Sequence, residues 1–70
     1  MTISHEQALV ERLIAEISRE YGHSPAAGAS WVTFSNGEEG CYRGLDAAGC
    51  AELQARARLK TTFYAQRFCP

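Results

Sequence analysis

The chain has 70 residues, of which 46% are hydrophobic and 21% are charged, and its formal net charge is −1 at pH 7. This length allows one domain, residues 1–70, and this composition excludes a disordered chain, which would be poorer in apolar residues. So short a chain buries only about 60% of the surface that its unfolded form exposes, so we expect a further source of stability.

Residues 5–21 are predicted to form the first α-helix. Apolar side chains recur there at spacings of three and four, at Val10, Leu13, Ile14, Ile17 and Tyr21. This is the stripe of an amphipathic helix. Ser4 and Gln7 match a capping box before it, and Gly22 suits the left-handed residue that commonly ends a helix. Residues 23–30 contain a proline and a glycine and are interpreted as a linker within the domain.

A two-stranded antiparallel ribbon is predicted next. The segment Trp31–Phe34 is β-branched and aromatic, as strands prefer, and Asn36-Gly37 favours a hairpin turn because both residues tolerate positive φ. Both faces of this ribbon carry large apolar groups. One face is therefore expected to pack on helices, and the other to meet a further surface.

Two registers of the ribbon are compatible with the sequence. If Asn36-Gly37 is a two-residue turn, Trp31 faces Tyr42. If the two following glutamates belong to the loop, the register shifts by two and Thr33 faces Tyr42 instead.

A second helix is predicted after Gly44, with Asp46 as its N-cap and Leu45 packing on Cys50 as a hydrophobic staple. One face of it would carry Cys50, Leu53, Ala57, Tyr64 and Phe68. Thr61-Thr62 is a weak point at which this helix kinks or restarts. The expected fold class is α+β, in the order helix, two-stranded antiparallel β-ribbon, helix.

The three cysteines, Cys41, Cys50 and Cys69, are odd in number and lack metal-ligand spacing. The N-terminus does not resemble a secretory signal, and no segment approaches the length of a membrane span. We therefore expect reduced thiols, a cytoplasmic protein without metal, cofactor or membrane association, and a homodimer as the source of extra burial. The dimer interface is expected at the large apolar residues Trp31, Phe34, Tyr42, Tyr64 and Phe68.

The charge is unevenly distributed. Residues 1–40 hold two arginines and six glutamates, a net of −4, whereas residues 41–70 hold five cations and two acids, a net of +3. This asymmetry is compatible with an anionic partner for the basic half, or with two halves that attract each other.

Within the basic half, Arg56, Lys60, Phe63 and Arg67 are spaced four, three and four, so they would share one helical face. Together with Arg43 and Arg58 they could hold a phosphate backbone while the ring stacks on a base. The alternative is a solvated rim whose long side chains cover the edge of the core.

Residues 31–68 resemble the KTSC domain, a short module named for the C-terminus of some lysyl-tRNA synthetases that also occurs as a free-standing bacterial protein. The resemblance lies in Phe34, Asn36, Gly37, Tyr42, Arg43, Leu45, Leu53, Phe63, Tyr64 and Phe68. The sequence departs from the family at Gly40, where a tyrosine is usual, in lacking the Ala-Ser-x-Gly step, and in its N-terminal helix. The resemblance implies a nucleic-acid role, RNA in particular.

No Ser/His/Asp or paired-carboxylate pattern is present, and the glycine-containing segment 35–40 lacks the lysine of a phosphate loop. The sequence thus predicts a protein that is not an enzyme and has no small-molecule substrate. The first functional hypothesis is a small dimeric nucleic-acid-binding or regulatory protein that contacts the phosphates of DNA or RNA through a basic C-terminal helix. The second is a protein–protein interaction module, an adaptor or inhibitor, that uses the face of Trp31 and Tyr42.

Overall fold

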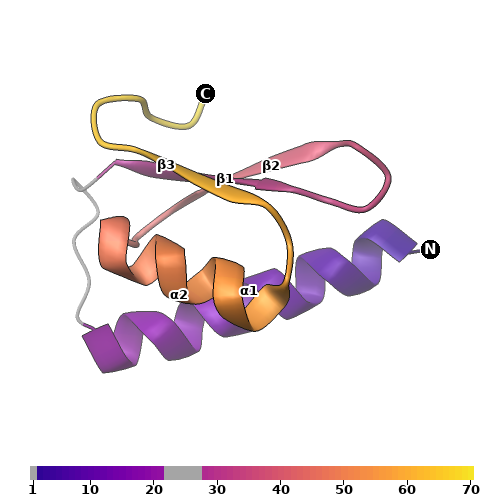
Figure 1. Ribbon diagram of the computed structural model, residues 1–70, viewed down its shortest axis with the longest axis horizontal. Helices are drawn as coiled ribbons and strands as arrows, with labels where there is room; N and C mark the ends of the chain where they lie inside the picture. Colours follow the sequence, from indigo (N-terminus) through magenta and orange to yellow (C-terminus); the bar gives the residue numbers. More distant parts are fainter. Residues whose placement is uncertain (1, 22–27) are drawn as a thin grey trace.

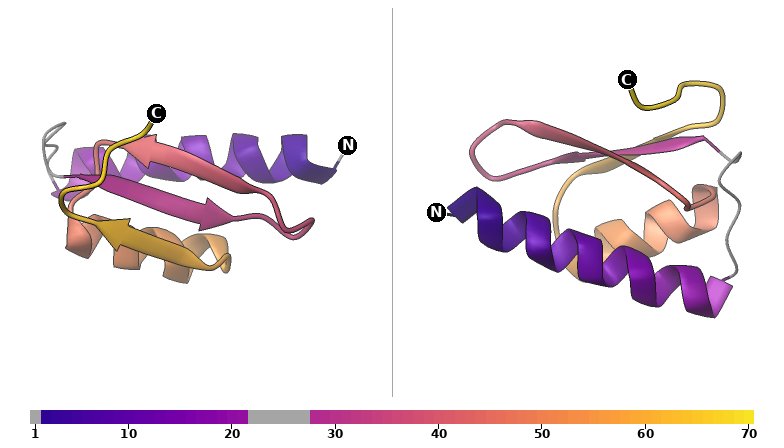
Figure 2. Two further views of the ribbon diagram at one scale, coloured as in Figure 1. Left: turned by 90° about the horizontal axis from the view of Figure 1, so that it is seen from above. Right: turned by 180° about the vertical axis from the view of Figure 1, so that it is seen from behind.

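The computed structural model describes residues 2–21 and 28–70, the first three of them by their backbone alone. The elements are α1 (Thr2–Tyr21), β1 (Ala29–Thr33), β2 (Glu39–Arg43), α2 (Ala47–Ala57) and β3 (Thr61–Tyr64). β1 lies in the centre of the sheet, antiparallel to both neighbours, in the order β2-β1-β3. Both helices lie on one face of this sheet (Figures 1 and 2), which we call the inner face. The α+β class is confirmed, but the two-stranded ribbon is wrong, because a third strand completes the sheet.

The helix α1 follows the predicted apolar stripe. Val10, Leu13 and Ile17 are buried, since their spacing of three and four turns them all toward the sheet and α2. The helix begins at Thr2, three residues before the expected start. The predicted cap at Gly22 and the linker up to residue 27 lie outside the described residues, as does the side chain of Ser4.

The hairpin between β1 and β2 adopts neither predicted register, because its loop has three residues, 35–37. Phe34 N donates to Glu38 O at 2.8 Å, and Gly37 N donates to Phe34 O at 2.9 Å. Gly37 has a φ of 89°, so it supplies the left-handed residue that closes this loop type. Trp31 therefore pairs with Cys41 rather than with Tyr42. A shift of one residue moves a side chain to the opposite face of a sheet.

The inner face carries the hydrophobic core. Seven buried side chains form one cluster, Val10, Leu13, Ile17, Val32, Phe34, Leu45 and Leu53. Tyr42 packs against this cluster from β2, and burial raises the pKa of its phenol. Phe34 is only 3% exposed. Phe34 is therefore not available for the predicted dimer contact in this fold, since the core already occupies its side chain, whereas Tyr42 is only partly buried.

The helix α2 starts as predicted and ends much earlier. Gly49 N donates to Asp46 Oδ1 at 2.8 Å, so Asp46 is the N-cap. The helix stops at Ala57, where Arg58 takes the left-handed conformation with a φ of 58° and donates its N–H to Gln54 O. The predicted continuation of the helix to Phe68 is wrong.

The segment Thr61–Tyr64 forms β3 instead of helix. Its β-branched and aromatic residues suit a strand, and β1 offers it an open edge of unpaired backbone groups. Gln54 Oε1 accepts a hydrogen bond from Thr61 N at 2.8 Å, which holds the turn between α2 and β3.

Residues 65–70, the C-terminal segment, cross the other face of the sheet, which we call the outer face (Figure 2). Cys69 forms a disulfide with Cys41 of β2, with a Cα–Cα distance of 5.6 Å. Cys50 is a buried free thiol, and burial raises its pKa. The prediction of three reduced cysteines is thus wrong for this pair, because β3 brings the chain end back beside β2.

None of the described helices has both the length and the apolar character needed to cross a membrane.

Candidate binding site on the outer face of the sheet

Strand alternation places Trp31 at the centre of the outer face. Its neighbours across the ladder are Cys41 on β2 and Thr62 on β3. Tyr64 lies on the same face of β3, two residues farther along. Tyr42 pairs with Ser30 and so points to the inner face. Trp31 and Tyr42 therefore do not share the face that the second functional hypothesis assigns to them.

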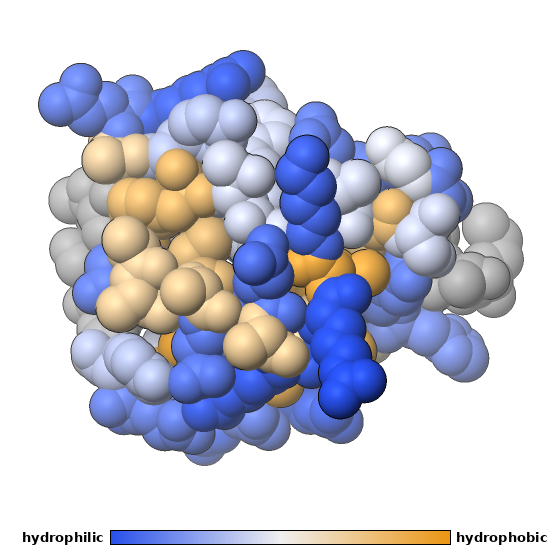
Figure 3. Space-filling view, in the orientation of Figure 1, coloured by the Kyte–Doolittle hydropathy of each residue, from blue (hydrophilic) through white to orange (hydrophobic). Residues whose placement is uncertain are grey.

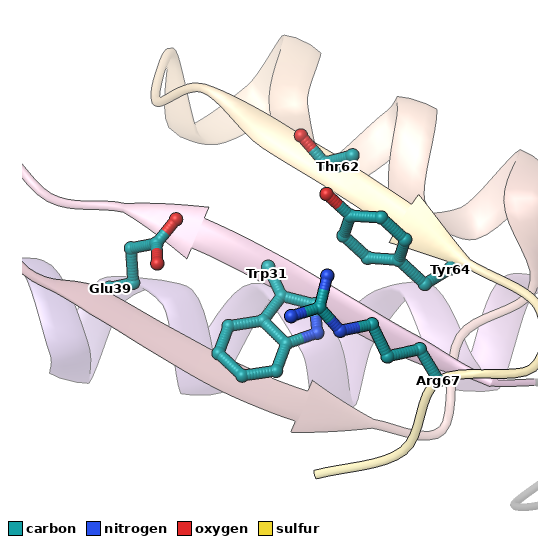
Figure 4. Close-up of a pocket in the computed structure, with 5 residues that line it drawn as sticks. All are labelled: Trp31, Glu39, Thr62, Tyr64 and Arg67. Carbon is teal, nitrogen blue, oxygen red and sulfur yellow. The ribbon is translucent and has the colours of Figure 1, made fainter.

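A shallow pocket of about 100 Å³ opens beside Trp31. It is lined by Trp31, Glu39, Thr62, Tyr64 and Arg67. Figure 4 shows that the three strands supply the first four of these residues, while Arg67 reaches in from the C-terminal segment. The strands thus form the floor of this site, and a segment without regular structure forms its cover.

The guanidinium of Arg67 lies over two aromatic rings. Its Cζ is 5.6 Å from the centroid of the Trp31 ring and 4.9 Å from that of Tyr64. At an exposed site such a cation–π contact contributes about 0.5–1 kcal/mol. Arg67 forms no ion pair within the described part of the chain, so the rings are its principal contacts.

Trp31 is half-buried, and its indole nitrogen is a buried donor. This Nε1 has no hydrogen-bond partner among residues 2–21 and 28–70. An unpaired buried donor costs about 1–3 kcal/mol. Beside it Tyr64 is 37% exposed, and Phe68 of the C-terminal segment is 53% exposed. The site therefore combines exposed aromatic surface with one unsatisfied polar group.

Arg56 is not available for a phosphate in the way the sequence predicts. Its Nη2 donates to Glu20 Oε1 at 2.7 Å, and its Nε lies 3.4 Å from Glu52 Oε2. The hydrogen bond from Arg56 lowers the pKa of Glu20, and Glu20 in turn raises the pKa of Arg56 above its usual range. This pair joins α1 to α2, so part of the charge asymmetry acts as attraction between the two halves of the chain.

The other predicted cations do not share a helical face. Arg58 and Lys60 lie in the turn between α2 and β3, and Arg67 lies beyond β3. Phe63 pairs with Ser30 on the inner face, where it is half-buried. Arg43 ends β2 on the outer face. The prediction that these residues lie on one basic C-terminal helix is therefore wrong, because the second half of that predicted helix forms β3 and the segment after it.

Two members of the site were not predicted from the sequence. Glu39 was assigned either to the loop or to the returning strand, and Thr62 to a weak point of a helix. The signal that could have identified Thr62 is the β-branched and aromatic composition of Thr61–Tyr64, which favours a strand. No group of three or more His, Cys, Asp or Glu side chains suited to a metal ion occurs in the described ranges.

A second apolar area lies over α2. Figure 3 shows hydrophobic surface gathered there, in the same orientation as Figure 1. Four alanines of this helix are exposed, Ala47, Ala48, Ala51 and Ala55. Their side chains are small and lack polar groups, so they offer little for selective recognition, and the outer face is the better candidate.

Comparison with protein-family models, with curated proteins and with solved structures gives no significant match. The resemblance to the KTSC domain therefore stays a proposal.

Proposed function

We propose that this chain is a protein–protein interaction module, an adaptor or inhibitor rather than an enzyme, that binds a segment of its partner on the outer face of the sheet. The observation that carries the proposal is the pocket beside Trp31, with the exposed ring of Tyr64 on its wall. Aromatic residues in partly desolvated pockets supply much of the binding energy at protein interfaces. The strands hold Trp31 and Tyr64 in fixed positions, which lowers the entropic cost of binding.

Charged groups around the pocket fit the polar rim of such an interface. Glu39 lies on one side of Trp31, and Arg43 ends the neighbouring strand on the same face. Rim charges contribute to the choice of partner and to the rate of association more than to affinity. The partner segment is therefore expected to be partly apolar and to carry charge.

Nucleic-acid binding is the second candidate, and one observation favours it. Arg43, Arg58, Lys60 and Arg67 are exposed and form no ion pair with the residues that the structure describes. Arg67 and Arg43 lie on the face that carries Tyr64, so a base could stack there while the cations contact phosphates. These cations belong to a strand end, a turn and the C-terminal segment, which supports a continuous phosphate track less well than one helix would.

Homodimer formation stays a prediction. The argument for it, uncovered apolar surface on the ribbon, is weaker than the sequence indicates. The C-terminal segment already covers part of the outer face, and the inner face is filled by the core. Of the expected interface residues, Trp31, Tyr64 and Phe68 remain on or next to the outer face. A cytoplasmic location also remains a proposal, and in that compartment Cys41 and Cys69 would be kept reduced.

Selection from a library of random linear peptides tests the proposal, carried out with and without a dithiol reductant. We expect peptides that bind the wild-type chain, lose at least tenfold in affinity with Tyr64→Ala, and keep it with Tyr21→Ala. Tyr21 is a matched control because it is 47% exposed and lies at the end of α1, outside the pocket.

Two results would count against the proposal. Recovery of no peptide in either condition, or equal binding by the Tyr64→Ala variant, would rule out this site. Binding of labelled DNA or RNA that falls steeply with salt would favour the second candidate, because each phosphate contact releases counterions.

A further inference from the structure

The outer-face site already holds a ligand-like group, the guanidinium of Arg67. This side chain lies over both rings of the site, although it belongs to a segment without regular structure (Figure 4). Glu39 lines the same pocket from β2. Two aromatic faces and a carboxylate favour a planar or alkylated cation. Arg67 can therefore be regarded as an internal occupant of a site for cationic side chains.

The contacts that keep Arg67 in place are few. Residues 65–68 and Pro70 are exposed, and no hydrogen bond links the C-terminal segment to a described strand or helix. The disulfide between Cys69 and Cys41 is the strong connection, since the cation–π contacts contribute only about 0.5–1 kcal/mol each at exposed sites. Cutting that one bond would leave the segment tethered only at the end of β3.

The unpaired indole N–H of Trp31 lowers the stability of the state in which Arg67 covers the site. It has no acceptor within residues 2–21 and 28–70 while Arg67 lies over the ring. The covered state therefore carries the desolvation cost of an unpaired buried donor, which a hydrogen bond to a carbonyl of a bound partner would remove.

We propose that the Cys41–Cys69 disulfide is a switch that holds Arg67 in the site, and that its reduction opens the site to an arginine or lysine side chain of a basic partner segment. This inference rests on the proposed interaction module and specifies both its ligand and its regulation. The reductant is a dithiol: it becomes a disulfide, and Cys41 and Cys69 gain two electrons and two protons as the S–S bond breaks. The half-buried positions of both cysteines leave room for thiol exchange.

The third cysteine does not compete in this exchange. Cys50 is buried in the inner layer, where burial raises the pKa of its thiol and disfavours the reactive thiolate. The exchange therefore involves only the pair that joins the C-terminal segment to β2. Removal of Arg67 also leaves Glu39 as the charged group of the pocket, which makes the open site complementary to a cation.

The experiment uses the fluorescence of Trp31, which is the single tryptophan of the chain. The probes are the blocked tripeptides Gly-Arg-Gly and Gly-Glu-Gly, titrated into the oxidised and the dithiol-reduced protein. We expect reduction to shift the emission to longer wavelength and to strengthen Gly-Arg-Gly binding at least tenfold, with no binding of Gly-Glu-Gly. Arg67→Ala should bind Gly-Arg-Gly in both redox states, because it lacks the internal occupant and keeps the disulfide. Cys69→Ser should bind it without reductant.

Matched variants complete the design. Arg58→Ala, an exposed cation outside the pocket, should behave as the wild type, and Glu39→Gln should weaken Gly-Arg-Gly binding to the reduced protein. Equal Gly-Arg-Gly binding by the oxidised and reduced wild type would overturn the switch, as would equal binding of Gly-Glu-Gly. If library peptides without basic residues bind the outer face equally in both states, the interaction module stands and the switch is wrong. If Arg67→Ala and Cys69→Ser bind neither tripeptide nor any library peptide, both proposals are wrong.

Discussion

The two faces of the sheet are stabilised in different ways. The inner face is covered by two helices, and the side chains packed between the sheet and these helices, among them Val32 of β1 and Leu53 of α2, are fully buried. Among the described residues, the outer face is covered by the C-terminal segment, 65–70, under which Trp31 stays half-buried. Many small apolar contacts stabilise the inner face. On the outer face, the Cys41–Cys69 disulfide and the guanidinium of Arg67 over two aromatic rings hold the C-terminal segment in place.

This difference indicates where the fold and the function reside. A face that depends on burial loses stability with every change of shape, so it can vary little. A face that depends on one reducible bond can be uncovered without unfolding the domain. Stability is therefore expected to follow changes on the inner face, and accessibility of the site to follow changes on the outer face.

The largest expected effect is on the inner face. Leu53→Ala removes a side chain that is 0% exposed and should lower the free energy of unfolding by about 2–5 kcal/mol, through lost transfer energy and a cavity. Phe68→Ala is the matched control on the outer side. Its side chain is 53% exposed, so the change should stay within about 0.5 kcal/mol. Urea denaturation measures the free energy of unfolding of each variant. Similar losses for the two variants would contradict the expectation that stability depends on the inner face.

The next effect concerns the disulfide. Cys41 and Cys69 are 28 residues apart, and a closed loop of this size stabilises a fold by about 3.5 kcal/mol through the entropy of the unfolded chain. The double variant Cys41→Ser/Cys69→Ser should lose that amount, yet keep the far-UV circular dichroism of the wild type. Reductant should leave this variant unchanged, which controls for effects on Cys50. Loss of helical signal upon reduction would mean that the outer cover is required for the inner core.

A smaller effect is expected at the N-cap of α2. Asp46→Ala removes the acceptor for Gly49 N and should lower the free energy of unfolding by about 1 kcal/mol. Asp46→Asn should retain most of this stability, since an amide oxygen also accepts the bond. An alanine variant as stable as the asparagine variant would show that the core alone fixes the start of this helix.

The smallest effect is the acid dependence of the ion pair between α1 and α2. The hydrogen bond from Arg56 lowers the pKa of Glu20 below 4.5. A carboxyl whose pKa is lowered by folding contributes stability above its unfolded pKa, and this contribution is lost as the pH falls through the folded value. Arg56→Gln should therefore reduce the loss of stability below pH 4.5. Identical pH profiles of thermal unfolding for variant and wild type would show that this exposed pair contributes nothing measurable.

Signals contained within a few residues were sufficient for part of this fold. The apolar stripe from Val10 to Ile17 predicts α1, and Asp46 predicts the start of α2, because each depends on contacts within one helix. The hairpin was also predictable as an element, since Asn36-Gly37 favours a turn in any context. Its register was not, because a loop of two, three or four residues satisfies the same sequence, and each added residue turns Tyr42 to the other face.

Tertiary structure decided the rest, and the site depends on it. Thr61–Tyr64 is compatible with a helix by spacing and with a strand by residue type, and the open edge of β1 decides for the strand. That strand carries Tyr64 to the side of Trp31 and the chain end back to Cys41. The sequence predicts Trp31 and Tyr64 at a dimer interface and Arg67 on a separate nucleic-acid-binding helix. Their assembly into one site rests on contacts between residues distant along the chain, and such contacts leave no periodic pattern in the sequence.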